Sequence, residues 1–156
     1  MLQLILHLLG DYLLQSEAMA ACKRNSSAWA GFHAVTYALP FWLLQPSWSA
    51  WAVICASHFL IDRCGLARHV IWAKNIVLGL WPKWLCRTLA RPKPASAAAR
   101  ASRLEEWGGD CRRLAWSNCK ATGYPADLEP WLAATLLMIA DNTIHLLINW
   151  SALRWL

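Results

Sequence analysis

The chain has 156 residues, of which 58% are hydrophobic and 15% are charged, with a formal net charge of +6. Soluble domains usually contain about 45–50% apolar and about 25% charged residues, so this composition disfavours a soluble enzyme and favours a single membrane domain. Nine of the fifteen Lys and Arg residues lie between Lys83 and Lys120, which is typical of a cytoplasmic loop and disfavours a nucleic-acid-binding surface.

Four apolar segments predict membrane-spanning helices, since a span needs around 20 predominantly apolar residues. In chain order they cover about 2–21, 26–44, 48–63 and 128–150. Pro40 is expected to bend the far end of the second segment, and the third is short for a full span. Pro130 suits the first turn of the last segment, where a missing N–H costs nothing.

A fifth apolar segment, about 70–84, is interrupted by Lys74, Gly79 and Pro82, and we expect a short re-entrant or interfacial helix. A basic loop follows over about 85–127. The predicted fold is therefore an all-α membrane protein: a four-helix transmembrane bundle with this short helix and a basic cytoplasmic insertion. Twelve tryptophans, a residue enriched at membrane–water boundaries, fit a lipid bilayer as the main partner.

Histidine and aspartate recur four residues apart in three of the apolar segments. The pairs are His7 and Asp11, His58 and Asp62, and Asp141 and His145. Residues four apart share one face of a helix, and ionisable groups in a membrane normally face the bundle interior. We therefore expect one buried polar column, which His33 and Gln15 join at similar depth.

Imidazole and carboxylate together suit a divalent transition metal such as Zn, Mn or Fe, and a metal would offset the cost of burying the carboxylates. Sites of this kind activate water for hydrolysis of phosphoryl or acyl groups. The predicted catalytic carboxylates are Asp11, Asp62 and Asp141, and Gln15, Lys23 and Lys74 are expected to support the ligands or contact the substrate. The predicted metal ligands are His7, Asp11, His33, His58, Asp62, Asp141 and His145.

Other interpretations of the same residues stay open. The His/Asp pairs could be ion pairs or hydrogen bonds that hold helices together. The protein would then be non-enzymatic and could bind and modulate another membrane protein of the envelope, with the basic 83–120 region as its partner surface. A small transporter or proton relay would use the same residues as well.

Several motifs of this chain form one pattern: His7-Leu-Leu-Gly-Asp11-Tyr-Leu-Leu-Gln15, Lys23, His33-Ala-Val-Thr-Tyr-Ala-Leu-Pro40, His58-Phe-Leu-Ile-Asp62-Arg63, Lys74 and Asp141-x-x-x-His145. This pattern resembles the DUF3307 family of small bacterial and phage membrane proteins, whose name assigns no function. The resemblance covers the four apolar segments and treats about 84–125 as a variable insertion, and typical members carry Gln where this chain has Asn142. The basic connections between the segments predict a multi-pass protein of the bacterial inner (plasma) membrane with these loops in the cytoplasm.

The layout is also similar in style to membrane-bound metal-dependent hydrolases of the YdjM type, which place His and acidic ligands on transmembrane helices. That likeness implies a metal-dependent hydrolase acting on a lipid or lipid-linked substrate. It rests on architecture alone, so the substrate must be argued from the site itself.

Overall fold

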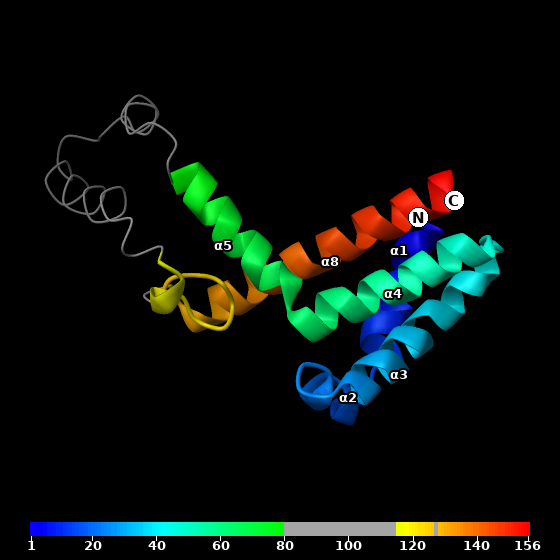
Figure 1. Cartoon of the computed structure of the whole chain (residues 1–156), viewed down its shortest axis with the longest axis horizontal. Coiled ribbons are helices and arrows are strands. Elements are labelled where there is room, and N and C mark those ends of the chain that lie inside the picture. Colours follow the sequence, from blue (N-terminus) through cyan, green and yellow to red (C-terminus); the bar gives the residue numbers. More distant parts are fainter. Residues whose placement is uncertain (80–114, 127) are drawn as a thin grey trace, which may run out of the picture. The chain divides into compact units, whose positions relative to one another are not determined.

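The computed structural model describes residues 1–79, 115–126 and 128–156, and the regular elements within these ranges are helices (Figure 1). An isolated β-bridge between Cys119 and Pro125 is the β-structure found there. The expectation of an all-α fold is therefore confirmed for the described part of the chain. Most of the expected basic loop at 85–127, and the end of the helix expected at 70–84, lie outside the described residues.

The chain divides into two units. The first comprises Met1–Ala67 and Met138–Leu156, and the second comprises Arg68–Leu137. All the predicted His and Asp ligands lie in the first unit, so the candidate site can be described within it.

The first expected span is not one continuous helix. Helix α1, Leu2–Leu8, passes into a π-helix, η1, over Leu9–Leu13, and a separate helix, α2, covers Glu17–Cys22. Gly10 lies in the π-helix, where an added Cβ would be 2.8 Å from both Cδ2 and the carbonyl oxygen of Tyr37. The glycine thus allows the backbone of η1 to approach α3 closely, and wider π turns of this kind are frequent at functional sites.

The second expected span begins as predicted and changes its winding at Pro40. Helix α3 covers Ser27–Ala38, and the Oγ of Ser26 accepts a hydrogen bond from the Trp29 N–H at its start. Proline has no N–H to donate to the helix ladder, and the chain continues from there as a 3₁₀ helix, η2, over Leu39–Leu44.

Helix α4, Trp48–Cys64, corresponds closely to the third expected span. The Oγ of Ser47 caps its first turn by accepting from the Ala50 N–H, and Gly65 ends it with a positive φ of 58°. That left-handed conformation favours glycine, because a Cβ would be strained there. In Figure 1, α3 and α4 run alongside each other, and both carry residues of the hydrophobic core.

The core of the first unit lies beside the polar residues. Its buried members come from α1, α3, η2, α4 and the last helix, α8, Pro130–Trp155. Several are alanines, which let the helix backbones come close together. The cluster consists of Leu6, Tyr37, Ala38, Phe41, Ala50, Ile54 and Ala152.

In the second unit, α5, Leu66–Gly79, begins four residues before the interfacial helix expected at 70–84. A short 3₁₀ helix, η4, covers Trp116–Asn118. The Nζ of Lys74 donates to the hydroxyl of Tyr124 at 3.3 Å and lies 5.5 Å from the centre of its ring. Lys74 therefore has a partner within its own unit.

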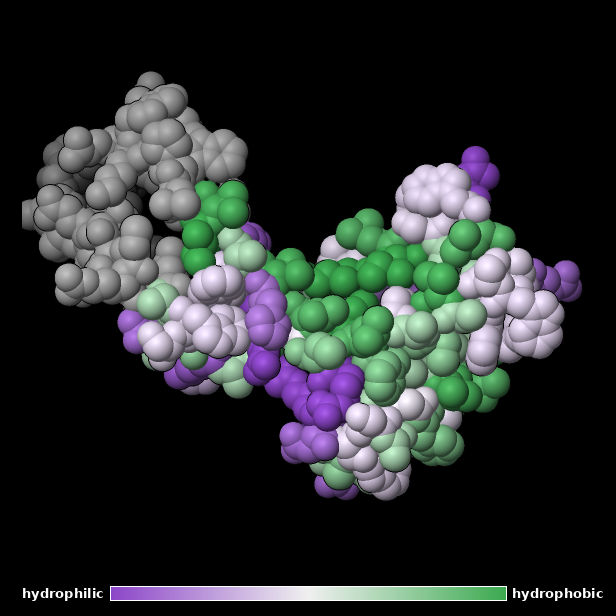
Figure 2. Space-filling view, viewed as in Figure 1, coloured by the Kyte–Doolittle hydropathy of each residue, from purple (hydrophilic) through white to green (hydrophobic). Residues whose placement is uncertain are grey.

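Among the described residues, α8 is long and apolar enough to cross a membrane, and α4 and α5 pass the same test only when taken together as a broken span. Leu147 on α8 is 60% exposed and Ile139 is 54% exposed, and Figure 2 shows hydrophobic residues over α8 and α4. These features give partial support for association with a membrane. A bundle of four spans is not established, because α3 has 12 residues and the apolar N-terminal stretch ends at Leu13.

Candidate metal centre

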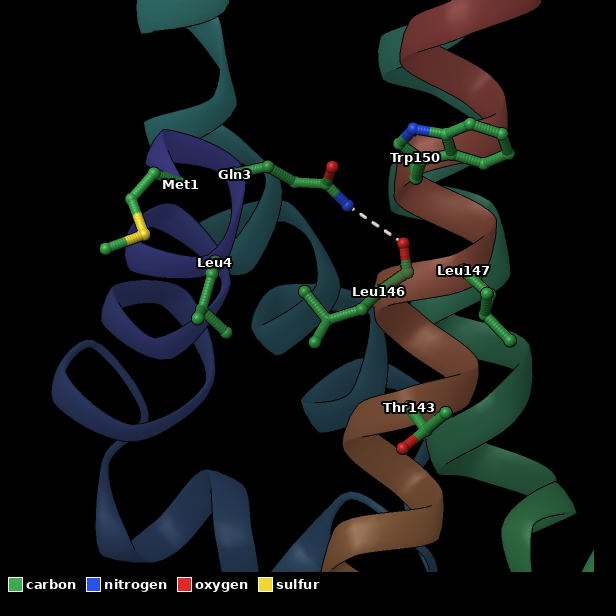
Figure 3. Close-up of a pocket in the computed structure, with 7 residues that line it drawn as sticks. All are labelled: Met1, Gln3, Leu4, Thr143, Leu146, Leu147 and Trp150. Atoms are coloured by element: carbon green, nitrogen blue, oxygen red, sulfur yellow. Dashed lines mark hydrogen bonds between the residues drawn. The ribbon is translucent and has the colours of Figure 1, made fainter.

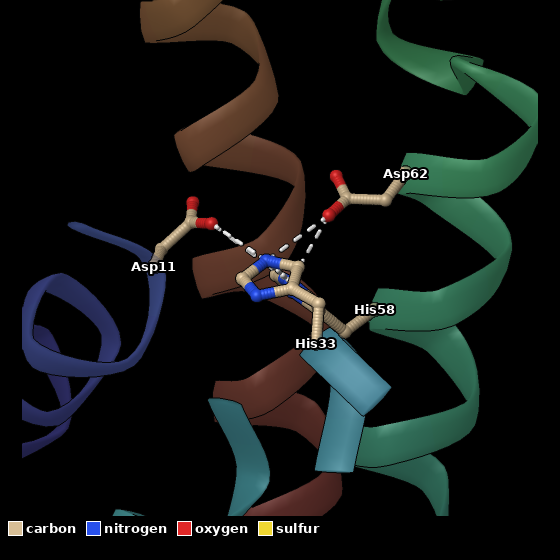
Figure 4. Close-up of side chains that lie close together, drawn as sticks. All are labelled: Asp11, His33, His58 and Asp62. Atoms are coloured by element: carbon tan, nitrogen blue, oxygen red, sulfur yellow. Dashed lines mark hydrogen bonds and ion pairs between the residues drawn. The ribbon is translucent and has the colours of Figure 1, made fainter. Parts of the chain in front are cut away.

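Four buried side chains from three helices converge in the first unit (Figure 4). Asp11 comes from η1, His33 from α3, and His58 and Asp62 from α4; we call these four the Asp/His cluster. The Nε2 atom of His33 lies 3.3 Å from Oδ1 of Asp11 and 3.3 Å from Oδ2 of Asp62. The Nε2 atom of His58 lies 3.2 Å from the same Asp62 oxygen and 3.9 Å from Asp11 Oδ1.

The spacing of these atoms fits a metal ion. In a tetrahedral site with bonds of about 2.0–2.1 Å, neighbouring ligand atoms lie about 3.3 Å apart. The two Nε2 atoms are 3.0 Å apart, and the four nitrogen–oxygen distances run from 3.2 to 3.9 Å. Two imidazoles and two carboxylates in this arrangement could hold one divalent ion, and all four residues are less than 10% exposed.

Packing fixes the orientation of the two rings. The ring of His58 stacks on that of Tyr37, with centroids 3.6 Å apart and planes 11° apart, and His33 meets His58 edge-on at 4.8 Å. The Nδ1 atoms of His33 and His58 are buried and have no hydrogen-bond partner among the described residues. Aromatic contacts therefore take the place of the second hydrogen bond that orients most metal-binding histidines.

Lys23 and Gln15, which were expected to support the ligands, both lie beside the cluster. The Nζ of Lys23 is 2.8 Å from Oδ2 of Asp62 and 4.0 Å from Oδ1 of Asp11. It also donates to Oε1 of Gln15 at 2.8 Å. Lys23 sits at the end of α2, so the break in the first expected span is what brings its ammonium to the carboxylates.

A second group of possible ligands shares one residue with the Asp/His cluster. Asp62, Asp141 and His145 each offer a ligand atom, and these atoms lie within 4.8 Å of one another. His145 Nδ1 lies 2.9 Å from the carbonyl oxygen of Asp141 and 3.6 Å from its Oδ2. The third His/Asp pair therefore approaches the other two in space, from a helix more than seventy residues further along the chain.

His7 belongs to neither group of possible ligands, and both of its ring nitrogens have hydrogen-bond partners. Nε2 is 2.7 Å from the Oδ1 of Asn142, and Nδ1 is 2.8 Å from the hydroxyl of Tyr37. The amide oxygen only accepts, so Nε2 carries the proton and Tyr37 donates to Nδ1. Asn149 Nδ2 donates in turn to the Tyr37 oxygen at 2.6 Å, so His7 is held as a satisfied structural residue.

His7, Asp11 and Gln15 are spaced four residues apart in the first expected span, but they do not share one helix face. The π-helix begins at Leu9, between the first two residues, and the helix has ended before Gln15. His7 consequently contacts α3 and α8 through hydrogen bonds, whereas Asp11 reaches the Asp/His cluster.

Three buried or half-buried polar residues near the site were missed from the sequence: Tyr37, Asn142 and Asn149. Two of them continue the spacing that revealed the histidines, since Tyr37 follows His33 by four residues and Asn149 follows His145 by four. Extending the four-residue rule to uncharged polar side chains would have found both. For Asn142, the sequence offered only one indication, which is that typical members of the resembled family carry Gln at this position.

A groove of about 320 Å³ lies elsewhere in the first unit, between α1 and α8 (Figure 3). Gln3 Nε2 donates to the carbonyl oxygen of Leu146 across it at 2.8 Å. Its lining is mostly apolar, and no member of the Asp/His cluster contributes to it. The lining residues are Met1, Gln3, Leu4, Thr143, Leu146, Leu147 and Trp150.

A family model described as "Protein of unknown function (DUF3307)" matches residues 1–78, which is half of the chain. No curated protein and no solved structure matches. The matched region contains all four residues of the Asp/His cluster and ends before Asp141 and His145.

Proposed function

The chain belongs to the DUF3307 family, and we propose that it is a membrane protein whose buried His/Asp metal centre hydrolyses a lipid or lipid-linked substrate. The family has no assigned function, so the proposal depends on the site. The observation that carries it is the convergence of two imidazole nitrogens and two carboxylate oxygens from three helices on one buried point.

The charge of the cluster supports a bound cation. Asp11 and Asp62 bring two carboxylates into a buried site, where Lys23 supplies one ammonium. Buried charges are costly unless they are compensated, and a divalent ion would offset the remaining negative charge. With two nitrogen and two oxygen donors, Zn, Fe and Mn are the ions to expect.

A metal ion bound here supplies a Lewis acid and a water made reactive at neutral pH. The chain's own residues divide the remaining work. Lys23 is 19% exposed at its side chain and sits beside the carboxylates, so it is placed to hold the anionic part of a substrate. Asp141, with its side chain 29% exposed, is the most accessible of the three predicted catalytic carboxylates and is placed to meet the water or substrate that enters the centre.

A lipid substrate fits the surroundings of the site. The helices that carry the ligands expose large apolar side chains, and α8 has the length and hydropathy of a span. A substrate that reaches polar groups beneath such a surface must itself be compatible with hydrocarbon. Placement in the bacterial inner membrane, with the basic loops in the cytoplasm, is part of the same proposal.

The test is hydrolysis by the whole protein, purified in detergent and returned to vesicles of phosphatidylethanolamine, phosphatidylglycerol and phosphatidic acid, or of these lipids with a polyprenyl diphosphate. Released phosphate and fatty acid are measured with added Zn²⁺, Mn²⁺ or Fe²⁺ and with chelator. We expect turnover that chelator abolishes and metal restores. Asp62→Asn should lose it, and His69→Asn, an exposed histidine outside both ligand groups, should retain it. Metal-loaded wild type that hydrolyses none of these lipids would overturn the hydrolase assignment.

A proton relay or small transporter is a second candidate, favoured by the contact of Lys23 with Asp62 at 2.8 Å and by the short contact between His33 and His58. Such a chain of ionisable groups can pass protons without a metal. It predicts pH-dependent flux in liposomes that chelator leaves unchanged. The remaining alternative, binding to another membrane protein through residues 83–120, places its surface largely outside the described residues.

A further inference from the structure

We propose that the centre holds two metal ions, the second bound by Asp62, Asp141 and His145, with Asp62 shared between both positions. This inference rests on the metal centre of the proposed function and extends it. Its second ion would be held by one imidazole and two carboxylates, a donor set richer in oxygen than that of the Asp/His cluster.

Asp62 can serve both positions because it belongs to both groups of convergent ligand atoms. Its Oδ2 faces the Nε2 atoms of His33 and His58 at 3.3 and 3.2 Å. An ionised carboxylate offers two oxygens with about four lone-pair sites, so Asp62 can bind one ion and still have lone pairs for a second. The residue is only 6% exposed, and water therefore competes little for these lone pairs.

The tautomer of His145 is the one that a metal ligand would need, with the proton on Nδ1 and a lone pair on Nε2. Its Nδ1 lies 2.9 Å from the backbone carbonyl of Asp141, and a carbonyl oxygen can only accept, so Nδ1 carries the proton. A hydrogen bond from Nδ1 to a backbone carbonyl is a common way to fix the tautomer that presents Nε2 to a metal. The same backbone contact holds the ring in place on α8.

The Nε2 atom of His145 then has a free lone pair in a buried place. The residue is 1% exposed, and this atom has no hydrogen-bond partner among the described residues. Buried polar atoms in native proteins nearly always have a partner. Apolar packing alone does not account for a basic nitrogen kept in this tautomer and shielded from solvent.

The ring of His145 lies next to the first site, with its centroid 4.4 Å from that of His58, a member of the Asp/His cluster. The two groups are thus neighbours that share a carboxylate, as in two-metal sites that clamp a substrate between ions. Because the second position has three protein ligands and two of them are carboxylates, it should favour Mn²⁺ or Fe²⁺ and bind less tightly than the first.

The experiment uses the full chain in detergent, stripped with chelator and reloaded with Mn²⁺. Bound manganese is counted by elemental analysis, and the coupling between ions is read by electron paramagnetic resonance. We expect two manganese ions per chain with the spectrum of an exchange-coupled pair. His145→Asn should reduce this to one uncoupled ion, while His69→Asn should keep two.

Asp141→Asn gives an independent test, since its partly exposed side chain makes misfolding less of a risk. It should also lower the content from two ions to one. A wild-type protein that binds one uncoupled ion, unchanged in both variants, would overturn the second position and leave the proposed function standing. A wild-type protein that binds none would overturn both.

Discussion

The Nε2 atoms of His33 and His58 face each other at 3.0 Å, on two neighbouring helices and away from solvent. Two neutral imidazoles can place only one proton between such nitrogens. Both atoms also face the carboxylates of Asp11 and Asp62. The two imidazoles and two carboxylates thus have few protons with which to hydrogen-bond one another, and they lie at the spacing of metal ligands. A cation at their centre would stabilise all four.

Replacing Tyr37 with Phe should show that the hydrogen bonds of its hydroxyl stabilise the fold without being needed for metal binding. The change removes the hydroxyl that joins His7 Nδ1 to Asn149 Nδ2 but keeps the ring that stacks on His58. Leaving a buried polar atom unpaired costs about 1–3 kcal/mol, and two atoms lose their partner here. The free energy of unfolding should therefore fall by about 2–6 kcal/mol, with the metal content retained. Denaturation in detergent measures the first quantity and elemental analysis the second.

The matched control for this change is Tyr12→Phe. The hydroxyl of Tyr12 bonds to Asn142 at 2.7 Å, but the residue is 50% exposed, so its loss should alter stability by less than about 0.5 kcal/mol. A Tyr37→Phe protein of normal stability that lacks metal would show that the hydroxyl acts on the ligands directly.

Gly10→Ala should disrupt the packing of η1 against α3. The new Cβ would lie 2.8 Å from the carbonyl oxygen of Tyr37 and 3.1 Å from its Cα, and backbone atoms cannot move aside as a side-chain tip can. Overpacking of this kind typically costs about 1–3 kcal/mol. Because Asp11 is the next residue, its carboxylate should shift and metal affinity should fall with stability.

Gly31→Ala is the control, because an added Cβ at Gly31 in α3 meets nothing within 4 Å. Alanine has a helix propensity better than that of glycine by up to about 1 kcal/mol, so this variant should be as stable as the wild type or more so. Equal destabilisation by the two substitutions would mean that the approach of η1 to Tyr37 is not what requires Gly10. Thermal unfolding of both variants in the same detergent decides this.

Lys23→Gln should bind metal more tightly than the wild type. The ammonium lies 2.8 Å from Oδ2 of Asp62, where it competes with a divalent ion for the carboxylate and repels it. Like charges a few ångströms apart near a protein surface interact by several kcal/mol, so a gain of about tenfold in affinity is a conservative expectation. Competition with a calibrated chelator measures the dissociation constant.

Arg24→Gln removes the same charge from the neighbouring, exposed position and should change the affinity little. Hydrolysis by the Lys23 variant should fall even as metal binding improves, because the lysine is proposed to hold the anionic substrate. Weaker metal binding in Lys23→Gln would instead show that the lysine positions Asp62.

Ile139→Arg tests whether α8 lies in lipid. Ile139 is 54% exposed, and at an exposed position of a soluble protein such a change is usually within about 0.5 kcal/mol of neutral. At the centre of a membrane-spanning helix, arginine costs about 2.5–3.5 kcal/mol on insertion scales. Membranes washed with alkaline carbonate should retain the wild type and lose most of the variant. Release of the wild type by the same wash would rule out an integral protein.

The elements that follow local rules could be predicted from the sequence. On α4, His58 and Asp62 lie one turn apart and do meet the same cluster, because the helix between its Ser47 cap and Gly65 is regular. Ser26 as an N-cap and the change of winding at Pro40 also follow from local chemistry. Such features depend on residues within a few positions of each other, which a single sequence displays.

Tertiary contacts account for what the sequence did not reveal. The π-helix at Leu9–Leu13 depends on Gly10 approaching Tyr37, a residue 27 positions away, so nothing local marked where the His7 and Asp11 faces diverge. The local sequence also does not show which histidines have hydrogen-bond partners on other helices. His7 and His145 each lie four residues from an aspartate, yet of these two only His7 has partners at both ring nitrogens among the described residues.

The central claim is that Asp11, His33, His58 and Asp62 bind a metal ion. Elemental analysis of the full chain, purified without chelator, tests it most directly, with Asp62→Asn and His69→Asn prepared in parallel. We expect at least one stoichiometric transition-metal ion in the wild type and in His69→Asn, and less than a tenth of that in Asp62→Asn. A wild-type protein that stays free of metal after incubation with Zn²⁺, Mn²⁺ and Fe²⁺ would contradict the account.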